Sequence, residues 1–314
     1  MKTLVTGGAG FIGSHLVDRL VAKGENIIVF DNLSSGKLEF IQKHIDSGKI
    51  KFVKADLMNP AEIDSAIRGC DMVWHLAANP DVKLGASDTR IHLDQNIIAT
   101  YNLLESMRKN GIKKIGFTST STVYGEATQM PTPENYGPCI PISLYGASKS
   151  ACEALISAYC GTFDMESVLY RFANIIGPRS THGVIFDFIR KLKANPSELE
   201  ILGDGKQTKS YCYIDDCVDS MLFGWEHRKA RTEVFNVGSS DGIDVKGLAD
   251  VVVKEMGLKS KYKFTGGVDG GRGWKGDVKM MMLSIEALGK LGWKPKYTSA
   301  RSIALTARSI LGKK

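Results

Sequence analysis

The N-terminal residues place a glycine-rich turn between a strand pattern and a helix pattern. Residues 2–5 are rich in apolar and β-branched side chains, residues 6–13 read TGGAGFIG, and residues 13–22 have helical apolar periodicity. The glycines fit two spacings of a phosphate-binding turn, G-x-G-x-x-G at Gly8, Gly10 and Gly13, and G-x-x-G-x-x-G at Gly7, Gly10 and Gly13. The helix would offer its unpaired amides and positive dipole end to a phosphate. This order of elements predicts a parallel α/β sheet that binds a dinucleotide at its first turn.

Strand and helix patterns continue to alternate through the first half of the chain. Strands are expected at residues 2–5, 26–30, 51–53, 72–75, 114–118 and 167–171, helices at 13–22 and 95–109, and a late strand at 233–237 that rejoins the sheet. The predicted fold class is α/β, a Rossmann-type doubly wound parallel sheet with a smaller C-terminal α/β substrate-binding lobe. The dinucleotide-binding domain would be formed by residues 1–174, rejoined by 211–241, and the lobe by residues 175–210 and 242–314.

Composition narrows the class of protein. The 314 residues are 43% hydrophobic with a net charge of +7, and six cysteines are scattered without a C-x-x-C or Cys/His cluster. We therefore expect reduced thiols and no metal site. No apolar run is long enough to span a membrane and the first strand has no secretory signal before it, which predicts a cytoplasmic protein. The basic charge is not accompanied by a nucleic-acid motif or a dense basic stripe, so no nucleic-acid partner is expected.

An aspartate follows the second expected strand. The segment IIVFDNLSSGK places Asp31 eighteen residues after Gly13. A carboxylate at this position accepts hydrogen bonds from both ribose hydroxyls of an adenosine and repels a 2′-phosphate. The pattern favours NAD as the cofactor. An aspartate after a strand is also common as a turn or cap residue, and the nearby Lys37 keeps NADP open.

Tyr145 and Lys149 stand one helical turn apart in the segment SLYGASKSACEAL. Such a pair is usually a surface tyrosine over a lysine stem, but downstream of a dinucleotide fold it is typical of an acid–base pair. A free tyrosine has a pKa of about 10, and an ammonium one turn away is expected to lower that pKa. The strand before this helix ends in GFTSTSTVYGE, and one of its hydroxyls is expected to donate to the reacting oxygen. Threonine and valine also favour strands without any such role.

Together these motifs resemble a known family. TGGAGFIG, DNLSSG, KADLMN, HLAA at 75–78, TSTSTVYGE, YGASK at 145–149 and RFANIIGPR at 171–179 are similar to the motifs of the extended short-chain dehydrogenases/reductases. Within that family, nearly the whole chain resembles the UDP-glucose (UDP-galactose) 4-epimerases and related NAD-dependent nucleotide-sugar epimerases.

The resemblance implies the residues of an NAD site. The expected ligands are Gly7, Gly10, Phe11, Ile12 and Gly13 for the pyrophosphate, Asp31, Asn32, Asp56 and Leu57 for the adenosine, and Ala77, Ala78, Asn96, Tyr145 and Lys149 for the nicotinamide half. In this family the tyrosine is the catalytic base and the lysine its partner. Alignment on VYG places the catalytic hydroxyl at Thr120, where serine is more common; both residues present one hydroxyl.

The resemblance also implies substrate contacts, at Ser119, Thr120, Tyr145, Asn174, Gln207, Lys209, Tyr211, Arg272 and Asp277. The family segment GDGxQTRD reads GDGKQTKSY here, so Lys209 replaces an arginine and loses its bidentate fork. Arg272 is the expected second clamp on the diphosphate, and Asp277 is expected to hold the ribose. The position that limits the width of the sugar pocket falls near Met281, a flexible side chain that leaves N-acetyl sugars open.

The implied reaction is 4-epimerisation of a UDP-hexose, UDP-glucose or UDP-galactose, through a transient 4-keto sugar. Tyr145 would take the proton of the 4-hydroxyl, Thr120 would hydrogen-bond the same oxygen, and NAD would take and return the hydride. Thr120 is followed by Ser121 and Thr122 and not by the acid pair of a 4,6-dehydratase. Epimerases of UDP-N-acetylhexosamines or UDP-uronic acids, a UDP-uronate decarboxylase and a non-catalytic NAD-binding regulator remain as alternatives. The homodimer usual in the family would form through residues 97–109 and 147–159.

Overall fold

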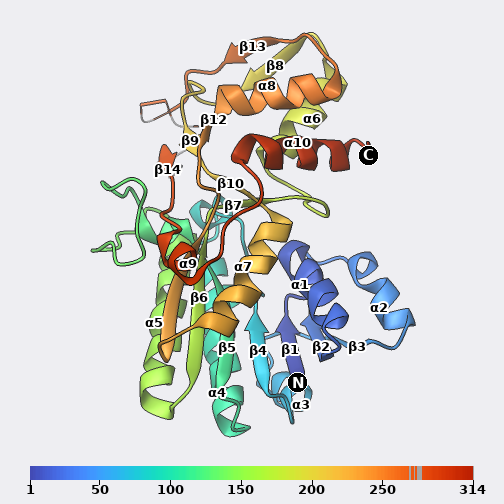
Figure 1. Ribbon diagram of the computed structural model, residues 1–314, viewed down its shortest axis with the longest axis vertical. Coiled ribbons are helices and arrows are strands. Elements are labelled where there is room, and N and C mark those ends of the chain that lie inside the picture. Colours follow the sequence, from blue (N-terminus) through green and yellow to red (C-terminus); the bar gives the residue numbers. More distant parts are fainter. Residues whose placement is uncertain (269, 272, 274–277, 314) are drawn as a thin grey trace. The chain divides into compact units, whose positions relative to one another are not determined.

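The computed structural model describes residues 1–268, 270, 271, 273 and 278–313. Its main sheet has seven strands in the order β11-β6-β5-β4-β1-β2-β3 (Figure 1). These strands are β1 (Lys2–Thr6), β2 (Asn26–Asp31), β3 (Ile50–Lys54), β4 (Met72–His75), β5 (Lys114–Thr120), β6 (Glu166–Phe172) and β11 (Thr232–Val237). The pairs β1–β2, β2–β3, β1–β4 and β4–β5 are parallel. The strand order reverses between β1 and β4, and ligands of open α/β sheets bind at the carboxyl ends of strands that flank such a point.

The predicted Rossmann-type sheet is confirmed. Every predicted strand lies within an observed strand, and β11 rejoins the sheet beside β6, as expected. Four of the five residues of β1 and all four of β4 are buried. Strands of a parallel sheet are buried on both faces, which explains why their sequences read as continuous apolar runs.

The first five α-helices of the chain all belong to the part that contains this sheet. They are α1 (Phe11–Ala22), α2 (Gln42–Asp46), α3 (Pro60–Ile67), α4 (Ala99–Lys109) and α5 (Leu144–Phe163). The helix expected at 95–109 begins earlier, as a π-helical segment (Leu93–Ile98) that continues into α4. Ser143 caps α5, because its side chain accepts a hydrogen bond from the N–H of Gly146. This cap places Tyr145 and Lys149 in the first turns of α5.

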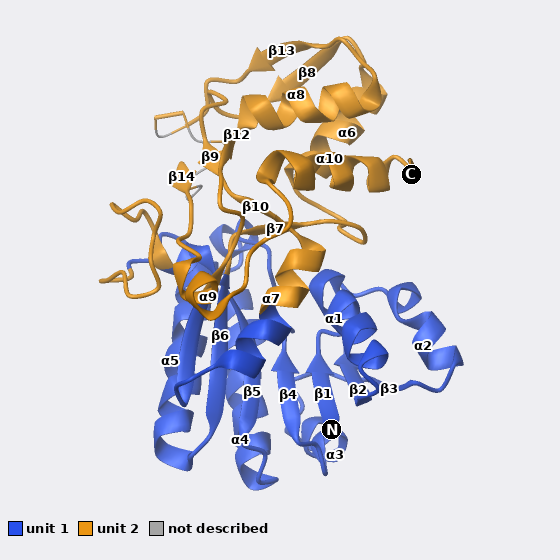
Figure 2. Ribbon diagram, in the orientation of Figure 1, with its two compact units in different colours: residues 1–123, 140–171, 221–235 blue, residues 124–139, 172–220, 236–314 orange. Residues whose placement is uncertain are grey.

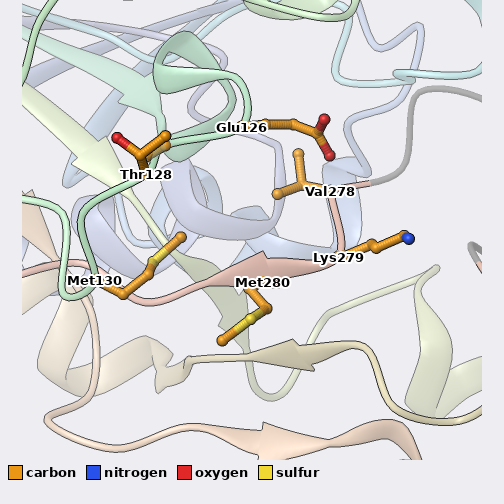
Figure 3. Close-up of a pocket in the computed structure, with 7 residues that line it drawn as sticks. Glu126, Thr128, Met130, Val278, Lys279 and Met280 are labelled. Carbon is orange, nitrogen blue, oxygen red and sulfur yellow. The ribbon is translucent and has the colours of Figure 1, made fainter.

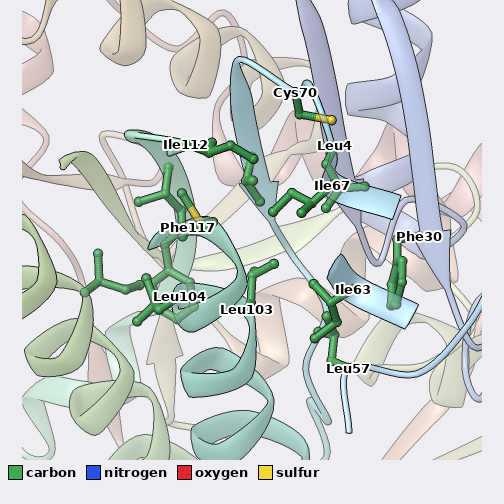
Figure 4. Close-up of a cluster of buried hydrophobic side chains, with 14 of the residues drawn as sticks. Leu4, Phe30, Leu57, Ile63, Ile67, Cys70, Leu103, Leu104, Ile112 and Phe117 are labelled. Carbon is green, nitrogen blue, oxygen red and sulfur yellow. The ribbon is translucent and has the colours of Figure 1, made fainter. Parts of the chain in front are cut away.

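An apolar core fixes the sheet against its helices (Figure 4). Leu4 of β1 and Phe30 of β2 belong to one buried cluster with Ile63 of α3, Leu103 of α4 and Phe117 of β5. Each of these side chains is at most 1% exposed. Burial of one such side chain stabilises a fold by roughly 1.5–3 kcal/mol, so this cluster holds the strand ends in place.

The chain forms two compact units, which Figure 2 colours separately. The first unit consists of residues 1–123, 140–171 and 221–235, and the second of residues 124–139, 172–220 and 236–314. Beyond β6 the elements are β7 (Asn174–Ile176), α6 (Val184–Ala194), β8 (Glu198–Ile201), β9 (Thr208–Lys209), β10 (Tyr211–Tyr213), α7 (Ile214–His227), β12 (Ile243–Asp244), α8 (Val245–Met256), β13 (Lys261–Phe264), β14 (Met280–Met281), α9 (Glu286–Leu291) and α10 (Ser299–Ile310). Helices α6, α8 and α10 share a buried apolar cluster in the second unit. These units are defined by packing, and the predicted division at 174, 211 and 241, which was based on the alternation of strands and helices, stays a prediction.

Two other properties of the chain bear on its class. All six cysteines are free thiols. Among the described residues, no helix is both long enough and apolar enough to cross a membrane.

Candidate active site

The glycine turn at the start of α1 brings backbone segments together so closely that side chains are excluded. Gly7 has a φ of +67°, and a Cβ on it would lie 2.7 Å from the backbone nitrogen of Ala77. A Cβ on Gly13 would lie 2.1 Å from the carbonyl oxygen of Gly7. Gly10 caps α1 without a side chain, and no acidic residue lies in the first turn. The turn therefore fits an anion on the helix amides, and it holds all five predicted pyrophosphate ligands, Gly7, Gly10, Phe11, Ile12 and Gly13.

Asp31 lies at the carboxyl end of β2 and is 7% exposed. Its carboxylate accepts hydrogen bonds from the N–H of Ala9 at 3.0 Å and from the N–H of Leu33 at 2.8 Å, which ties the glycine turn to the loop after β2. Burial raises the pKa of Asp31, and the two N–H groups act in the opposite direction. A carboxylate has about four acceptor positions, so it can still accept hydrogen bonds from ribose hydroxyls.

The predicted adenosine residues lie together at the ends of β2 and β3. Asn32 donates a hydrogen bond from Nδ2 to Oδ2 of Asp56 at 2.9 Å. Leu57 is buried, and its carbonyl accepts a hydrogen bond from Asn102 of α4 at 2.9 Å. Lys37 is the residue because of which NADP remained a possible cofactor. Its ammonium lies 3.5 Å from a carboxylate oxygen of Glu39. This corner of the first unit fits an adenosine with a free 2′-hydroxyl.

A buried row of polar groups supports the end of β4. The hydroxyl of Thr6 lies 2.8 Å from Nδ1 of His75, and Nε2 of His75 lies 2.9 Å from the hydroxyl of Thr100. The N–H of Ala77 donates to the hydroxyl of Thr6 at 3.3 Å. Burial lowers the pKa of His75 to about 3, so the imidazole is neutral. This row holds the glycine turn, the loop after β4 and helix α4 in a fixed arrangement.

Asn96 joins the loop after β4 to helix α5. Its Oδ1 accepts a hydrogen bond from the N–H of Asn79 at 2.8 Å, and its Nδ2 donates to the hydroxyl of Ser148 at 2.8 Å. The thiol of Cys152 donates to the Asn96 carbonyl at 3.4 Å, within the π-helical segment. Helices of this kind are frequent at functional sites. The predicted nicotinamide residues Ala77, Ala78 and Asn96 therefore lie on connected segments, and the first unit as a whole fits a dinucleotide.

The predicted catalytic groups meet at the end of β5. The side chain of Thr120 interacts with that of Tyr145 and acts to lower the Tyr145 pKa. Lys149 is 3% exposed, and its ammonium donates to the carbonyl of Thr118 at 2.9 Å. The same ammonium lies 4.7 Å from the ring of Phe117. The end of β5 thus interacts with the side chains of both Tyr145 and Lys149 of α5.

Burial dominates the protonation of this cluster. It raises the pKa of Tyr145 to about 12 and lowers the pKa of Lys149 to about 8. The expected net lowering of the Tyr145 pKa is therefore not seen in this structure. Removal of the phenol from water is the largest cause of the rise, and the nearby Cys152 acts in the same direction. The hydrogen bond from Thr120 acts to lower the pKa of Tyr145 and offsets part of this effect.

A buried ion pair lies behind the catalytic cluster. Arg171, near the end of β6, donates two hydrogen bonds from Nε and one from Nη2 to the carboxylate of Glu153 on α5. Both side chains are nearly buried, at 11% and 10% exposed. The hydroxyl of Ser119, a predicted substrate contact, also donates to Glu153. The end of β5 is therefore fastened to α5 twice, by Ser119 and by Lys149.

Four of the predicted substrate residues lie in the second unit. Asn174 is paired with Tyr211 across β7 and β10, and its Nδ2 donates to the Ser210 carbonyl at 3.1 Å. Lys209 on β9 is paired with Met281 on β14, so the cation and the residue expected to limit pocket width are neighbours.

Gln207 is a buried polar group of this set. It is 5% exposed, and its Nε2 donates to the Gly271 carbonyl at 2.8 Å. Its Oε1 has no hydrogen-bond partner among the described residues. The two other predicted contacts, Arg272 and Asp277, lie outside the described residues.

A cavity of about 400 Å³ lies in the second unit (Figure 3). It is lined by Glu126, Ala127, Thr128, Met130, Val278, Lys279 and Met280. A cavity of this volume is within the usual range for small ligands. Its lining residues come directly after the VYG motif and directly before Met281 in the chain. The sequence therefore identified residues next to this cavity but none of those that line it.

Sequence reasoning missed three side chains around the catalytic cluster. The ring of His92 contacts the ring of Tyr145 at a centroid distance of 5.6 Å. The N–H and the hydroxyl of Thr122 both donate to the Thr120 hydroxyl at 3.2 Å, and Glu153 forms the ion pair described above. Spacing could have found Glu153, which stands four residues after Lys149 on the same face of α5.

Comparison with known proteins identifies the family of this chain. Residues 3–238 match the model of the NAD dependent epimerase/dehydratase family. A putative UDP-glucose 4-epimerase of Methanocaldococcus jannaschii is 35% identical over 93% of both chains. The UDP-glucose 4-epimerase of Mycolicibacterium smegmatis is 33% identical over 100% of this chain and 99% of its own. A crystal structure of a UDP-galactose 4-epimerase is 40% identical, with a TM-score of 0.88 over 99% of both chains.

More distant relatives carry other substrate names. A UDP-N-acetylglucosamine 4-epimerase of Methanobrevibacter ruminantium M1 is 28% identical over 99% of this chain and 98% of its own, with a TM-score of 0.87. A UDP-glucuronic acid 4-epimerase of Bacillus cereus, solved with NAD, is also 28% identical, with a TM-score of 0.89 over 99% of both chains. UDP-glucuronic acid decarboxylase 4 of Arabidopsis thaliana is 32% identical over 99% of this chain and 68% of its own. With its seven-stranded sheet, glycine turn and Tyr145–Lys149 pair, the chain belongs to the NAD dependent epimerase/dehydratase family, within the extended short-chain dehydrogenases/reductases, and uses NAD as its cofactor.

Proposed function

We propose that this enzyme interconverts UDP-glucose and UDP-galactose by inverting C4 of the hexose. The observation that carries the proposal is that the side chains of Tyr145 and Thr120 interact, with Lys149 one turn further along α5. A phenol and a hydroxyl that lie beside each other can both reach one substrate oxygen and move its proton. The relatives named UDP-glucose 4-epimerase and UDP-galactose 4-epimerase support the choice of sugar.

In the proposed mechanism, Tyr145 takes the proton of the sugar 4-hydroxyl and later returns it. When bound, NAD supplies a reversible acceptor for the hydride of C4. Thr120 donates a hydrogen bond to the same sugar oxygen while it becomes a carbonyl. Lys149 supplies positive charge one turn from the phenol, which favours the phenolate over the neutral form that burial favours.

The residues after Thr120 favour epimerisation over loss of water. Ser121 and Thr122 provide hydroxyl groups where elimination would need an acid and a base. The Thr122 hydroxyl is bonded to Thr120 and so supports the proton-transfer pair. With no carboxylate at these positions, the 4-keto sugar is returned to a 4-hydroxyl instead of being carried into another reaction.

The substrate's nucleotide would be held by residues of the second unit. Lys209 offers positive charge to a diphosphate, and Asn174 and Gln207 offer amide groups. Tyr211 lies opposite Asn174 and would complete this set. Firm contacts with UDP and loose contacts with the hexose would let the 4-keto sugar rotate in the site between the two hydride transfers.

The decisive assay mixes the purified enzyme with UDP-galactose, without added NAD, and follows UDP-glucose by anion-exchange chromatography. UDP-N-acetylglucosamine and UDP-glucuronic acid are run in parallel, with carbon dioxide release recorded for the latter. Conversion of UDP-galactose at the highest rate supports the proposal. A faster reaction with either other substrate, or release of carbon dioxide, would replace it with the corresponding epimerase or decarboxylase. A protein that holds NAD and converts none of them would be a binding protein.

We also propose that the enzyme is a cytoplasmic homodimer of galactose metabolism. Leu93 and Tyr101, beside and within α4, are each 45% exposed, and α5 exposes Ala147, Ala154 and Ala158. Small residues on one helix let a second helix pack closely, and large apolar residues gain from being covered. Light scattering of the wild type and of Ala154→Arg tests the interface. A monomeric wild type would contradict the dimer, and a dimeric Ala154→Arg would place its interface elsewhere.

A further inference from the structure

His92 is a buried histidine in contact with the proposed catalytic base. It is 1% exposed, and its ring lies edge-on to the ring of Tyr145, with centroids 5.6 Å apart and an interplanar angle of 62°. Edge-to-face contacts at this distance are favourable and depend on geometry. The phenol of Tyr145 therefore has an aromatic neighbour that limits how its ring can tilt.

The space for the His92 ring exists because residue 85 is glycine. A Cβ on Gly85 would lie 2.9 Å from Cδ2 and 3.1 Å from Nε2 of His92. The same Cβ would lie 3.2 Å from Cβ of Leu144, the residue directly before Tyr145. A side chain at position 85 would push His92, the start of α5, or both.

A chain of hydrogen bonds connects His92 to the backbone of Tyr145. Nδ2 of Asn96 lies 3.4 Å from Nδ1 of His92 and donates to the hydroxyl of Ser148 at 2.8 Å. The Ser148 hydroxyl donates in turn to the carbonyl of Tyr145 at 2.8 Å. An Asn96 amide that donates to Nδ1 requires the neutral imidazole that carries its proton on Nε2.

From these contacts we propose that His92 is a positioning residue that fixes the ring of Tyr145, and that Gly85 is required because it makes room for His92. The role in turnover rests on the proposed function of Tyr145 as the base. His92 acts on Tyr145 in two ways, on its ring through the aromatic contact and on its backbone through Asn96 and Ser148. A misplacement of about 1 Å in a reacting group can lower turnover by about a hundredfold, so a fixed position of the Tyr145 ring should raise kcat.

The charged groups around His92 favour the neutral ring on which this arrangement depends. Burial lowers the pKa of His92, and the charge of Lys149 acts in the same direction. The Asp81 carbonyl and the carboxylates of Asp81 and Asp88 act in the opposite direction and are outweighed. Burial therefore favours a neutral imidazole, whose Nδ1 can accept a hydrogen bond from Asn96.

The test observes Tyr145 directly and does not depend on turnover. The full-length enzyme is labelled with 3-fluorotyrosine, and the Tyr145 resonance among the ten tyrosines is assigned by its loss in Tyr145→Phe. His92→Leu removes the ring contact and the acceptor for Asn96. We expect the Tyr145 fluorine resonance to move and to broaden, while the other tyrosine resonances stay in place. His227→Leu, at an exposed histidine in the last turn of α7, is the matched control and should leave the Tyr145 resonance unchanged.

A second, independent part of the test changes Gly85 and keeps residue 92 as histidine. Gly85→Ala should shift the Tyr145 resonance and lower kcat for UDP-galactose by about tenfold or more, with KM changed by less than about threefold, since the contacts with UDP are unaltered. In the background of His92→Ala, where the ring is gone, Gly85→Ala should cost much less in kcat. Coupling of this kind is what a double-mutant cycle detects between residues in contact.

The outcomes separate this inference from the proposed function. A Tyr145 resonance unchanged in His92→Leu and Gly85→Ala would overturn the positioning role, whatever the rates. Equal costs of Gly85→Ala with and without His92 would overturn the pairing of the two residues. If the wild type converts none of the UDP-sugars, the proposed function fails, and the fluorine spectra still decide whether His92 positions Tyr145.

Discussion

Thr122 donates two hydrogen bonds to the hydroxyl of Thr120, one from its backbone N–H and one from its own hydroxyl, both at 3.2 Å. A hydroxyl oxygen has two acceptor positions and one proton. With both acceptor positions used, the Thr120 proton is directed to the remaining partner, which is Tyr145. Thr122 thereby determines that Thr120 acts as a donor toward the phenol oxygen.

Thr122→Val should remove one of these two donors and leave the shape of the side chain unchanged. The Thr120 proton is then less firmly directed, and kcat should fall by about three- to tenfold, the effect of about one hydrogen bond. Thr122→Ser keeps the hydroxyl and should retain nearly all of the activity. Steady-state rates of the three proteins with UDP-galactose measure this. An unchanged kcat in Thr122→Val would show that the Thr122 hydroxyl does not direct the Thr120 proton.

Lys149 should set an alkaline limit to the activity. Burial lowers its pKa to about 8, so the ammonium is lost as pH rises through about 8, and with it the positive charge beside the phenol. We expect kcat to fall above that pH. In Lys149→Arg the cation persists, and the fall should move to higher pH even if the rate is lower. A wild-type rate that continues to rise above pH 8 would show that ionisation of Tyr145, and not of Lys149, controls the alkaline side.

The sequence predicted the sheet well because its strands are buried on both faces. Apolar runs at residues 72–75 and 114–118 mark such strands directly, and the glycine turn identifies where the ligand binds. Asp31, Tyr145 and Lys149 could also be identified from the sequence, because each stands at a fixed distance from a recognisable element.

The sequence could not predict the balance of forces inside the catalytic cluster. The direction of the Tyr145 pKa shift depends mainly on how much water the fold removes from the phenol, which is not a property of spacing. His92 and Thr122 escaped notice because a lone histidine or threonine has no pattern of its own. Their roles arise only from Gly85 and Thr120, which the fold brings into contact with them.

Glu153→Gln should destabilise the protein because it leaves the guanidinium of Arg171 without its counter-charge. Both side chains are nearly buried and are joined by three hydrogen bonds. Removing one partner of a buried ion pair typically costs about 3–5 kcal/mol of unfolding free energy. Urea unfolding followed by circular dichroism measures the loss.

The double variant Glu153→Met with Arg171→Met is the control for this prediction. It removes both charges, so no unpaired guanidinium remains, and its loss of stability should be smaller than that of Glu153→Gln. If the double variant is the less stable protein, the pair contributes through its shape and hydrogen bonds more than through its charge.

His75 should make the protein less stable as the pH falls below 6.5. Its pKa is about 3 in the folded chain against an ordinary 6.5, so between these values the unfolded chain binds a proton that the folded chain does not. The free energy of unfolding then falls by about 1.4 kcal/mol per pH unit from this residue. His75→Gln removes the titration, so its stability should decline by about 2 kcal/mol less than that of the wild type between pH 7 and pH 5. Parallel pH profiles of the two proteins would contradict a neutral buried imidazole.

Gly116→Ala should be among the most damaging small changes in the sheet. A Cβ on Gly116 would lie 2.3 Å from Cε3 and Cζ3 of Trp74, which is 1% exposed and packs against the rings of Tyr170 and Trp225. Because Trp74 is held by both rings, the clash cannot be relieved by a small tilt, and the expected loss is about 3 kcal/mol. Urea unfolding followed by tryptophan fluorescence measures both the loss and any displacement of Trp74.

Gly161→Ala is the matched control, since it adds the same methyl group where no atom lies within 4 Å. Gly161 lies inside α5, where alanine is favoured over glycine by about 1 kcal/mol, so this variant should be more stable than the wild type. The two substitutions are chemically identical and differ only in what the new methyl group meets. Opposite signs for their effects on the free energy of unfolding would establish that the contact with Trp74, and not the loss of glycine as such, requires residue 116 to remain without a side chain.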